Sequence, residues 1–125
     1  MNTLDVPSGD CYNVGIVAEH LGAFEQAILL SIVRLGERAY GRAILEEART
    51  RLKRDVAAGA VHATLERLER KGLVGSQLGS GTPIRGGRAR RFYRLRPQGL
   101  RALNGARAAI DSLWRGLKTP LRGYV

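Results

Sequence analysis

The stretch that decides the fold begins with GAVHATLERLERK (Gly59–Lys71). Within it, Val61, Leu65 and Leu68 follow one another at spacings of four and three residues, which predicts a short helix with one apolar face. Gly72 comes directly after the basic last turn, as a helix stop requires. Two further segments predict the arms of a β-hairpin: LVGSQL (Leu73–Leu78) and ARRFYRL (Ala89–Leu95).

The hairpin carries a high concentration of positive charge. No acidic residue lies between Leu73 and Arg96, and the connection from Gly79 to Arg88 is too long and too rich in glycine for a tight turn. Like charges this close together repel one another unless an anion lies against them. The sequence therefore favours a polyanionic partner for the six arginines of this segment: Arg85, Arg88, Arg90, Arg91, Arg94 and Arg96.

Composition points to one soluble domain with a basic surface. The chain has 125 residues, and 21 Lys and Arg against 11 Asp and Glu give a formal net charge of +10, which favours nucleic acid or an anionic membrane surface as partner. A single cysteine, Cys11, excludes an intramolecular disulfide framework and suits a reducing compartment. With no apolar run long enough for a bilayer and no secretory pattern at the start, a cytoplasmic protein without a membrane role is expected.

Two more helices are predicted before this stretch. Residues 1–20 show little periodicity and are expected to form a flexible or loosely packed arm. Residues 24–35 are apolar on nearly every side of a helix, which predicts burial both in the core and against a partner subunit. From Tyr40 to Leu52, apolar residues recur at every fourth position and predict the second helix.

A last helix is predicted from Pro97 to Leu117, followed by a tail (residues 119–125). Its apolar residues alternate at spacings of three and four, as in a coiled-coil seam. Because no other helix of the chain obviously covers this seam, the same helix of a second copy is the expected partner, with residues 97–118 as the dimerisation helix. The seam consists of Leu100, Leu103, Ala106, Ile110, Leu113 and Leu117.

Three helices, a hairpin and a long amphipathic helix form the layout of a winged helix-turn-helix protein: mostly α with a small β-hairpin, here over residues 21–96. Four segments narrow this further, and together they closely resemble the PadR family of bacterial transcriptional regulators. They are Phe24-Glu25, LGERAYG (Leu35–Gly41), GAVHATLERL (Gly59–Leu68) with KGLV (Lys71–Val74), and GGRARRFYRL (Gly86–Leu95).

The resemblance implies a homodimeric repressor, commonly one released from its operator by a small molecule or stress signal. It also implies that the third helix enters the major groove while the wing approaches the neighbouring minor groove. Three positions depart from the family pattern: His62 stands for the usual tyrosine, Ala57 for serine and Arg96 for threonine. These departures affect the details of operator recognition and not the class of protein.

The candidate DNA contacts lie on the third helix and the wing. Small residues let the helix press into a groove, while hydroxyl, imidazole and guanidinium groups bind phosphates or base edges. The plainer interpretation is a solvated basic surface, but that does not explain why the charge is concentrated in one hairpin. The predicted contacts with a pseudo-palindromic double-stranded operator are Gly59, His62, Ala63, Thr64 and Arg67 on the helix and Arg85, Arg88, Arg90 and Arg91 on the wing.

The predicted dimer interface combines two helices. Trp114, beside the seam, is either a packing residue at the dimer centre or the wall of a pocket for a planar aromatic effector. The predicted interface residues are Phe24, Ile28, Leu103, Ile110, Leu113 and Leu117.

Enzymatic interpretations find little support. His20, His62 and Cys11 lack metal-ligand spacing, and Gly79-Ser80-Gly81 is not followed by the lysine and helix of a phosphate loop. No catalytic residue, metal or cofactor is therefore expected. The open alternative from another class is a small-molecule-sensing or protein-interaction module whose winged helix no longer reads DNA.

Overall fold

Helix α1 is the element against which the others pack. The computed structural model describes residues 20–79 and 90–123. Helices α2, α3 and α4 and strand β4 all touch α1. In chain order the described elements are α1 (Ala23–Leu35), the 3-10 turn η3 (Gly36–Arg38), α2 (Gly41–Leu52), α3 (Ala58–Arg70), β3 (Val74–Leu78), β4 (Arg91–Leu95) and α4 (Pro97–Trp114).

Helix α1 is buried on one side and exposed on another. Ile28, Leu29 and Ile32 are almost wholly enclosed, whereas Leu30 and Val33 remain 48% and 53% exposed. The exposed pair fits the prediction that this helix has an apolar face left for a partner. The assignment of Ile28 to the dimer interface is wrong, because its side chain is 0% exposed within its own chain.

The helix-turn-helix unit is formed by α2 and α3. Ile44, Leu45 and Ala48 of α2 pack into the same core as the apolar face of α3. Helix α3 begins and ends one residue earlier than predicted, and α2 begins one residue later, differences within the usual fraying of helix ends. The predicted core stripe of α3 holds: Val61, Leu65 and Leu68 are all buried.

The wing is an antiparallel pair of strands. The register runs from Val74 opposite Leu95 to Leu78 opposite Arg91. The Tyr93 N–H donates to the Ala39 carbonyl at 2.8 Å, and Tyr40 forms an isolated β-bridge with Phe92, so the segment before α2 lies alongside β4. The predicted arginines at 85 and 88 lie outside the described residues.

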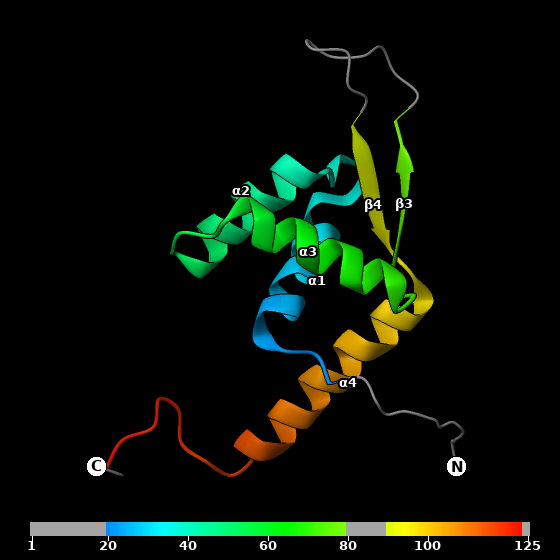
Figure 1. The fold of residues 1–125 in the computed structure, drawn as a ribbon. Coiled ribbons are helices and arrows are strands. Elements are labelled where there is room, and N and C mark those ends of the chain that lie inside the picture. The colour runs from blue at the N-terminus through cyan, green and yellow to red at the C-terminus, as the bar shows by residue number, and fades with distance from the viewer. Residues whose placement is uncertain (1–19, 80–89, 124–125) are drawn as a thin grey trace.

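Helix α4 leaves the base of the wing and runs off on the side of the molecule opposite to the hairpin (Figure 1). Its first half packs on its own chain: Gly99 is buried and Leu103 is 8% exposed in the core. Leu103 is therefore a residue of the monomer core, and its assignment to the dimer interface must be corrected. Ile110 and Leu113, further along, stay 48% and 73% exposed.

The end of α4 also differs from the prediction. The helix ends at Trp114, and Gly116 takes a left-handed φ of 87°. Pro120 follows, and a proline disfavours helical backbone at the residue before it. Leu117 lies beyond the helix, so it is not part of the seam. The architecture as a whole confirms the predicted mostly helical, winged helix-turn-helix fold.

Candidate nucleic-acid interface

One face of α3 is exposed among the residues that the structure describes. Gly59, His62, Ala63 and Glu66 are exposed there, and an added Cβ at Gly59 would meet nothing within 4 Å. The small side chains at 59 and 63 leave the backbone of the first turns open to close approach. His62 Nε2 lies 3.4 Å from Glu66 Oε2, so the acidic side chain lies beside His62. This face is accessible to a macromolecular partner.

Thr64 does not belong to that face. Its side chain is 3% exposed, and its Oγ1 accepts a hydrogen bond from Arg67 at 3.4 Å. Thr64 lies three residues after Val61 and four residues before Leu68, so it joins them on the buried face of α3. The prediction that Thr64 contacts DNA must therefore be withdrawn.

The starts of α2 and α3 are open to anions. Their N-cap residues, Tyr40 and Ala57, make no side-chain capping bond, and neither helix has an acidic residue in its first turn. The first N–H groups of a helix have no partner inside it and carry the positive end of the helix dipole. The absence of a serine cap at 57 thus leaves N–H groups free to bind a phosphate.

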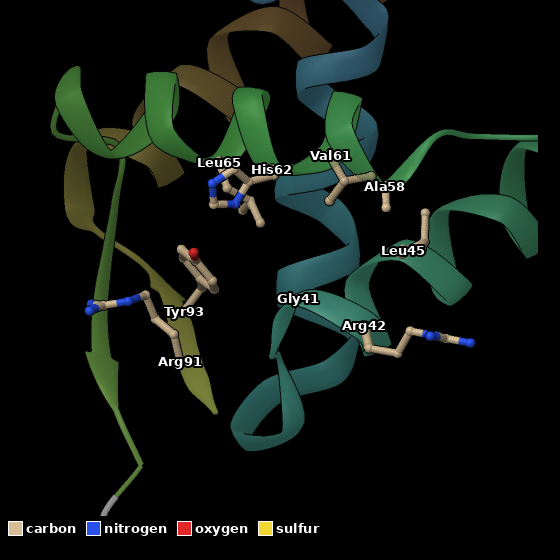
Figure 2. A pocket seen from close by; sticks show the side chains of 9 residues that line it. All are labelled: Gly41, Arg42, Leu45, Ala58, Val61, His62, Leu65, Arg91 and Tyr93. Carbon is tan, nitrogen blue, oxygen red and sulfur yellow. The ribbon is translucent and has the colours of Figure 1, made fainter. Parts of the chain in front are cut away.

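A hollow lies between these helix starts and the wing. Its volume is about 430 Å³, and Figure 2 shows the start of α2 on one side of it and β4 on the other. Arg42, His62 and Arg91 are the basic residues of its lining. The rest of the lining is mainly apolar: Gly41, Leu45, Ala58, Val61, Leu65 and Tyr93. A concave surface with basic groups and free N–H donors suits a sugar–phosphate backbone.

Aromatic and polar contacts hold the start of β4. The Arg90 guanidinium carbon lies 4.1 Å from the centre of the Tyr40 ring, a cation–π distance. The same ring meets Phe92 edge to face, with centroids 5.6 Å apart. Arg91 donates to Ser76 Oγ at 3.0 Å. Arg90 is thereby held against the N-cap residue of α2, and Arg91 is held against β3.

Further support comes from the underside of the wing. The Ser76 hydroxyl donates to Glu69 Oε2 at 2.7 Å and so links β3 to α3. Burial raises the pKa of Tyr93, with a smaller contribution in the same direction from the negative charge of Glu69. Tyr93 is thus a neutral phenol packed against the core at neutral pH.

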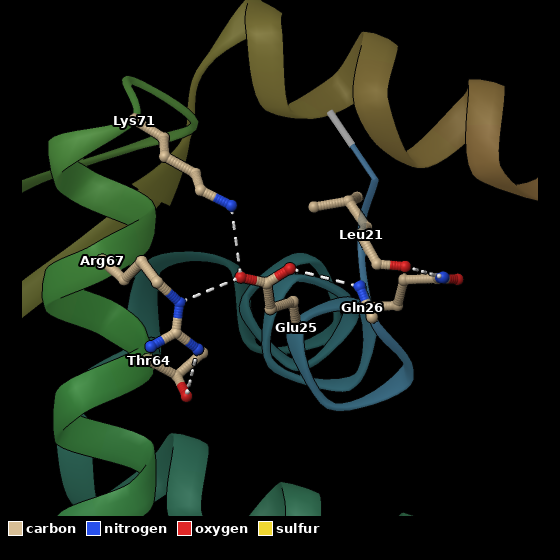
Figure 3. Close-up of polar contacts among 7 residues, drawn as sticks. Leu21, Glu25, Gln26, Thr64, Arg67 and Lys71 are labelled. Atoms are coloured by element: carbon tan, nitrogen blue, oxygen red, sulfur yellow. Dashed lines mark hydrogen bonds and ion pairs between the residues drawn. The ribbon is translucent and has the colours of Figure 1, made fainter. Parts of the chain in front are cut away.

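Arg67 points away from the open face and toward α1. Its Nε lies 3.1 Å from Glu25 Oε2, and Lys71 Nζ reaches the same oxygen at 3.4 Å (Figure 3). The other carboxylate oxygen accepts the Gly22 N–H at 3.2 Å. Burial acts to raise the pKa of Glu25, but the hydrogen bonds and positive charges around it outweigh this and hold the pKa below its ordinary value of 4.5. Glu25 is ionised at neutral pH.

The structure thus brings together part of the predicted set and adds to it. Gly59, His62, Ala63, Arg90 and Arg91 meet around the hollow or beside it. Arg42, Tyr40 and Glu25 were missed. A signal for Glu25 was present, because it lies on the same helical face as Ile28, Leu29 and Ile32, and a carboxylate among buried residues needs a partner.

A second surface lies at the far end of the molecule. Here a cavity of about 650 Å³ is lined by residues of α1, the end of α2 and α4, among them Leu30, Arg34 and Ile110. Trp114, one turn beyond Ile110, is 42% exposed. Phe24 is half-buried and packs against the core, so little of it is left for a partner.

The part of the chain that the structure describes contains neither a membrane-spanning helix nor a cluster of metal ligands. None of the helices there combines the length and the hydropathy needed to cross a bilayer. Among the same residues, no group of three or more His, Cys, Asp and Glu side chains could hold a metal ion.

A protein-family model matches most of the folded part of this chain. The model described as the transcriptional regulator PadR-like family matches residues 29–105, more than half of the chain. This chain belongs to the PadR-like family. PadR-like proteins are transcriptional regulators, which confirms both the family resemblance and the prediction that the chain is not an enzyme. No match was found among curated proteins.

Solved structures agree with this assignment. A PadR family regulator from Eggerthella lenta is 29% identical, with a TM-score of 0.56 over 71% of this chain and 75% of that chain. A complex structure of hsRosR-S1 is 26% identical, with a TM-score of 0.60 over 77% and 78%. Bordetella bronchiseptica BpsR, whose DNA binding is regulated by 6-hydroxynicotinic acid, shares the fold at 16% identity and a TM-score of 0.55, over 79% of this chain and 69% of BpsR.

Proposed function

We propose that this PadR-like protein is a homodimeric repressor that binds a pseudo-palindromic double-stranded DNA operator. The observation that carries the proposal is the surface formed by α3, the start of α2 and the wing. It combines an open helix face, two uncapped helix starts and basic side chains around one hollow. A cytoplasmic location follows from this role.

Each part of the surface has a separate task in the proposed complex. Helix α3 enters the major groove, where His62 reaches phosphates or base edges and the small residues at 59 and 63 allow close approach. Arg42, Arg90 and Arg91 bind the sugar–phosphate backbone. The wing-tip arginines at 85 and 88 are assigned to the adjacent minor groove, where the negative potential is strongest when the groove is narrow.

The dimer is proposed to form through the exposed ends of α4 and the exposed side of α1. Large apolar side chains that stay in water on both helices support this assignment, because a second copy would bury them. In such a dimer the two α3 helices occupy half-sites about one helical turn of DNA apart. The proposed interface residues are Leu30, Val33, Ile110, Leu113 and Trp114.

Selection of bound duplexes from random or genomic DNA tests the function directly. A recovered palindromic motif is the expected result, and recovery of unrelated sequences contradicts sequence-specific binding. The double variant Arg90→Gln/Arg91→Gln should weaken binding to that motif and flatten its salt dependence by about 0.9 per lost phosphate contact.

A matched control is available on α4. Arg101→Gln/Arg107→Gln removes the same charge from exposed positions away from the wing, and Arg107 is 82% exposed. This control should keep the wild-type salt dependence. Equal losses in the two double variants would mean that net charge alone, and not the wing, determines the affinity.

A response to a small molecule is a second candidate function. The cavity between α1, α2 and α4 favours it, because apolar walls and the guanidinium groups of Arg34 and Arg51 suit a planar aromatic anion. Trp114 follows Ile110 by four residues and shares its helix face, so its fluorescence should report binding. A titration with aromatic carboxylates that leaves both the fluorescence and the operator affinity unchanged would exclude this class of ligand.

A further inference from the structure

Glu25 offers Arg67 and Lys71 what a DNA phosphate would offer them. One carboxylate oxygen lies 3.1 Å from Arg67 Nε and 3.4 Å from Lys71 Nζ. The carboxylate is only 12% exposed, while the two basic side chains are 44% and 34% exposed. The side chains of Arg67 and Lys71 are thus partly exposed, whereas the Glu25 carboxylate that binds them is largely buried.

The contact joins elements that are far apart in the chain. Glu25 lies in the first turn of α1, and its partners lie in and just after the last turn of α3. The Gly22 N–H fixes the second carboxylate oxygen at 3.2 Å, so the anion cannot follow the basic groups outward. Figure 3 shows both basic side chains turned from α3 toward this one carboxylate.

We propose that Glu25 is a specificity-determining residue of DNA binding, which holds Arg67 and Lys71 off the phosphates and so lowers the affinity for non-operator DNA. This inference rests on the proposed function. Contacts with phosphates supply almost all of the non-specific binding of such proteins, whereas specificity is the ratio of operator to non-operator affinity. Two cations held internally therefore raise that ratio without any base contact.

The test measures binding of a non-operator duplex over a range of salt concentrations. Glu25→Gln keeps the size of the side chain and one acceptor oxygen, but it removes the charge and replaces the second oxygen with an NH2 donor. It should tighten binding and steepen the plot of log affinity against log salt by about 0.9 for each basic group released, per subunit. Glu25→Asp keeps the charge and should retain the wild-type slope.

The matched control is Glu47→Gln. Glu47 lies on α2 and pairs with Arg51 at 2.9 Å, so its substitution makes the same change in net charge without touching α3. Its slope should stay at the wild-type value. The triple variant Glu25→Gln/Arg67→Gln/Lys71→Gln should return the slope to that value, which a purely structural role of Glu25 would not produce.

Two results would overturn the inference. One is a slope for Glu25→Gln equal to that for Glu47→Gln. The other is a salt-dependence slope for Arg67→Gln/Lys71→Gln that is flatter than that of the wild type. Such a slope would mean that these two side chains already contact phosphates in the wild type. This second measurement does not depend on whether a Glu25 variant folds. Failure of the wild type to bind any duplex is a different outcome, which overturns the proposed function and this inference with it.

Discussion

Tyr40 is the residue that ties the wing to the helix-turn-helix unit. It is the N-cap of α2, the bridge partner of Phe92 and the ring on which Arg90 rests. All three roles depend on the backbone position and the ring, and none on the hydroxyl group. The position of Arg90 is therefore set by an aromatic side chain that does not itself carry charge.

This distribution of roles predicts the effect of two substitutions. Tyr40→Phe should leave the free energy of unfolding near the wild-type value, because both ring contacts remain. Tyr40→Leu removes the edge-to-face pair and the cation–π contact and should cost about 1–2.5 kcal/mol. Urea unfolding measures both variants, and equal losses would show that the ring contacts do not stabilise the wing.

Glu25 gives the stability a defined dependence on pH. Its pKa in the folded protein lies below the ordinary 4.5, so the folded state favours the ionised form. The resulting stabilisation is fully present above about pH 4.5 and is lost as the pH falls through the lowered folded pKa. The wild type should therefore be more stable than Glu25→Gln at pH 7, and this difference should shrink between pH 5 and pH 3.

The other carboxylates are common to both proteins, so subtracting the two unfolding curves isolates Glu25. A difference in the free energy of unfolding that stays constant from pH 7 to pH 3 would show that the charge of Glu25 does not stabilise the fold. A difference that grows toward low pH would contradict the sign of the shift.

Among the elements, α4 makes its tightest contact where it leaves the wing. The Arg96 N–H donates to the Leu73 carbonyl at 2.9 Å, and a Cβ added at Gly99 would lie 2.3 Å from that same oxygen. Leu95 Cδ1 would be 2.7 Å away. The absence of a side chain at 99 thus allows the helix to rest directly on the end of the wing.

Two glycines of α4 provide a matched test. Gly99→Ala should force α4 away from its seat and cost about 1–3 kcal/mol, as overpacking does. Gly105→Ala lies in the same helix with nothing within 4 Å of its Cβ and should gain about 0.5–1 kcal/mol from helix propensity. Thermal unfolding followed by circular dichroism measures both, and a neutral Gly99→Ala would mean that this docking is loose.

How far the sequence predicts an element depends on how local its causes are. Helix α3 was placed to within one residue, because its apolar spacing and the glycine after it are local signals. The predicted last helix is longer than α4, because the apolar spacing continues to Leu117 while the helix has already ended before Gly116. The burial of Leu103 was missed because it depends on how α4 docks, which no local pattern contains.

The same distinction holds for the candidate site. The exposed face of α3 and the charge of the wing follow from periodicity and composition. The inward turn of Arg67 does not, because its partner Glu25 is 42 residues away in the chain. The burial of Thr64 escapes prediction for a related reason. Its hydroxyl group suggests an exposed residue, but the hydroxyl accepts a hydrogen bond from Arg67 within the protein.

At the scale of the whole molecule, the two ends differ in character. The end formed by α3 and the wing is basic, whereas the far half of α4 presents large apolar side chains to water. Leu113 is 73% exposed and Ile110 is 48% exposed. This separation suits a protein that meets an anion at one end and its own copy at the other.

A charged side chain in the exposed apolar half of α4 should dissociate the proposed dimer. Ile110→Asp is expected to turn a dimer into a monomer in sedimentation velocity, because it buries an unpaired carboxylate in the proposed interface. Operator affinity should fall with it, since one half-site alone then holds each subunit. Ser112→Asp adds the same charge on a different face of α4 and should leave the dimer intact. A dimer that persists in Ile110→Asp would refute the interface.

The close contact of α4 at Gly99 has a consequence for the spacing of the operator half-sites that the proposed dimer would bind. In the proposed dimer, the angle at which α4 leaves each wing fixes the distance between the two reading helices. Operator half-sites recur about 34–36 Å apart, so a small tilt at this joint would be magnified into a different preferred spacing. Gly99, which does not contact DNA in the proposed complex, would then determine which half-site spacings the dimer can bind.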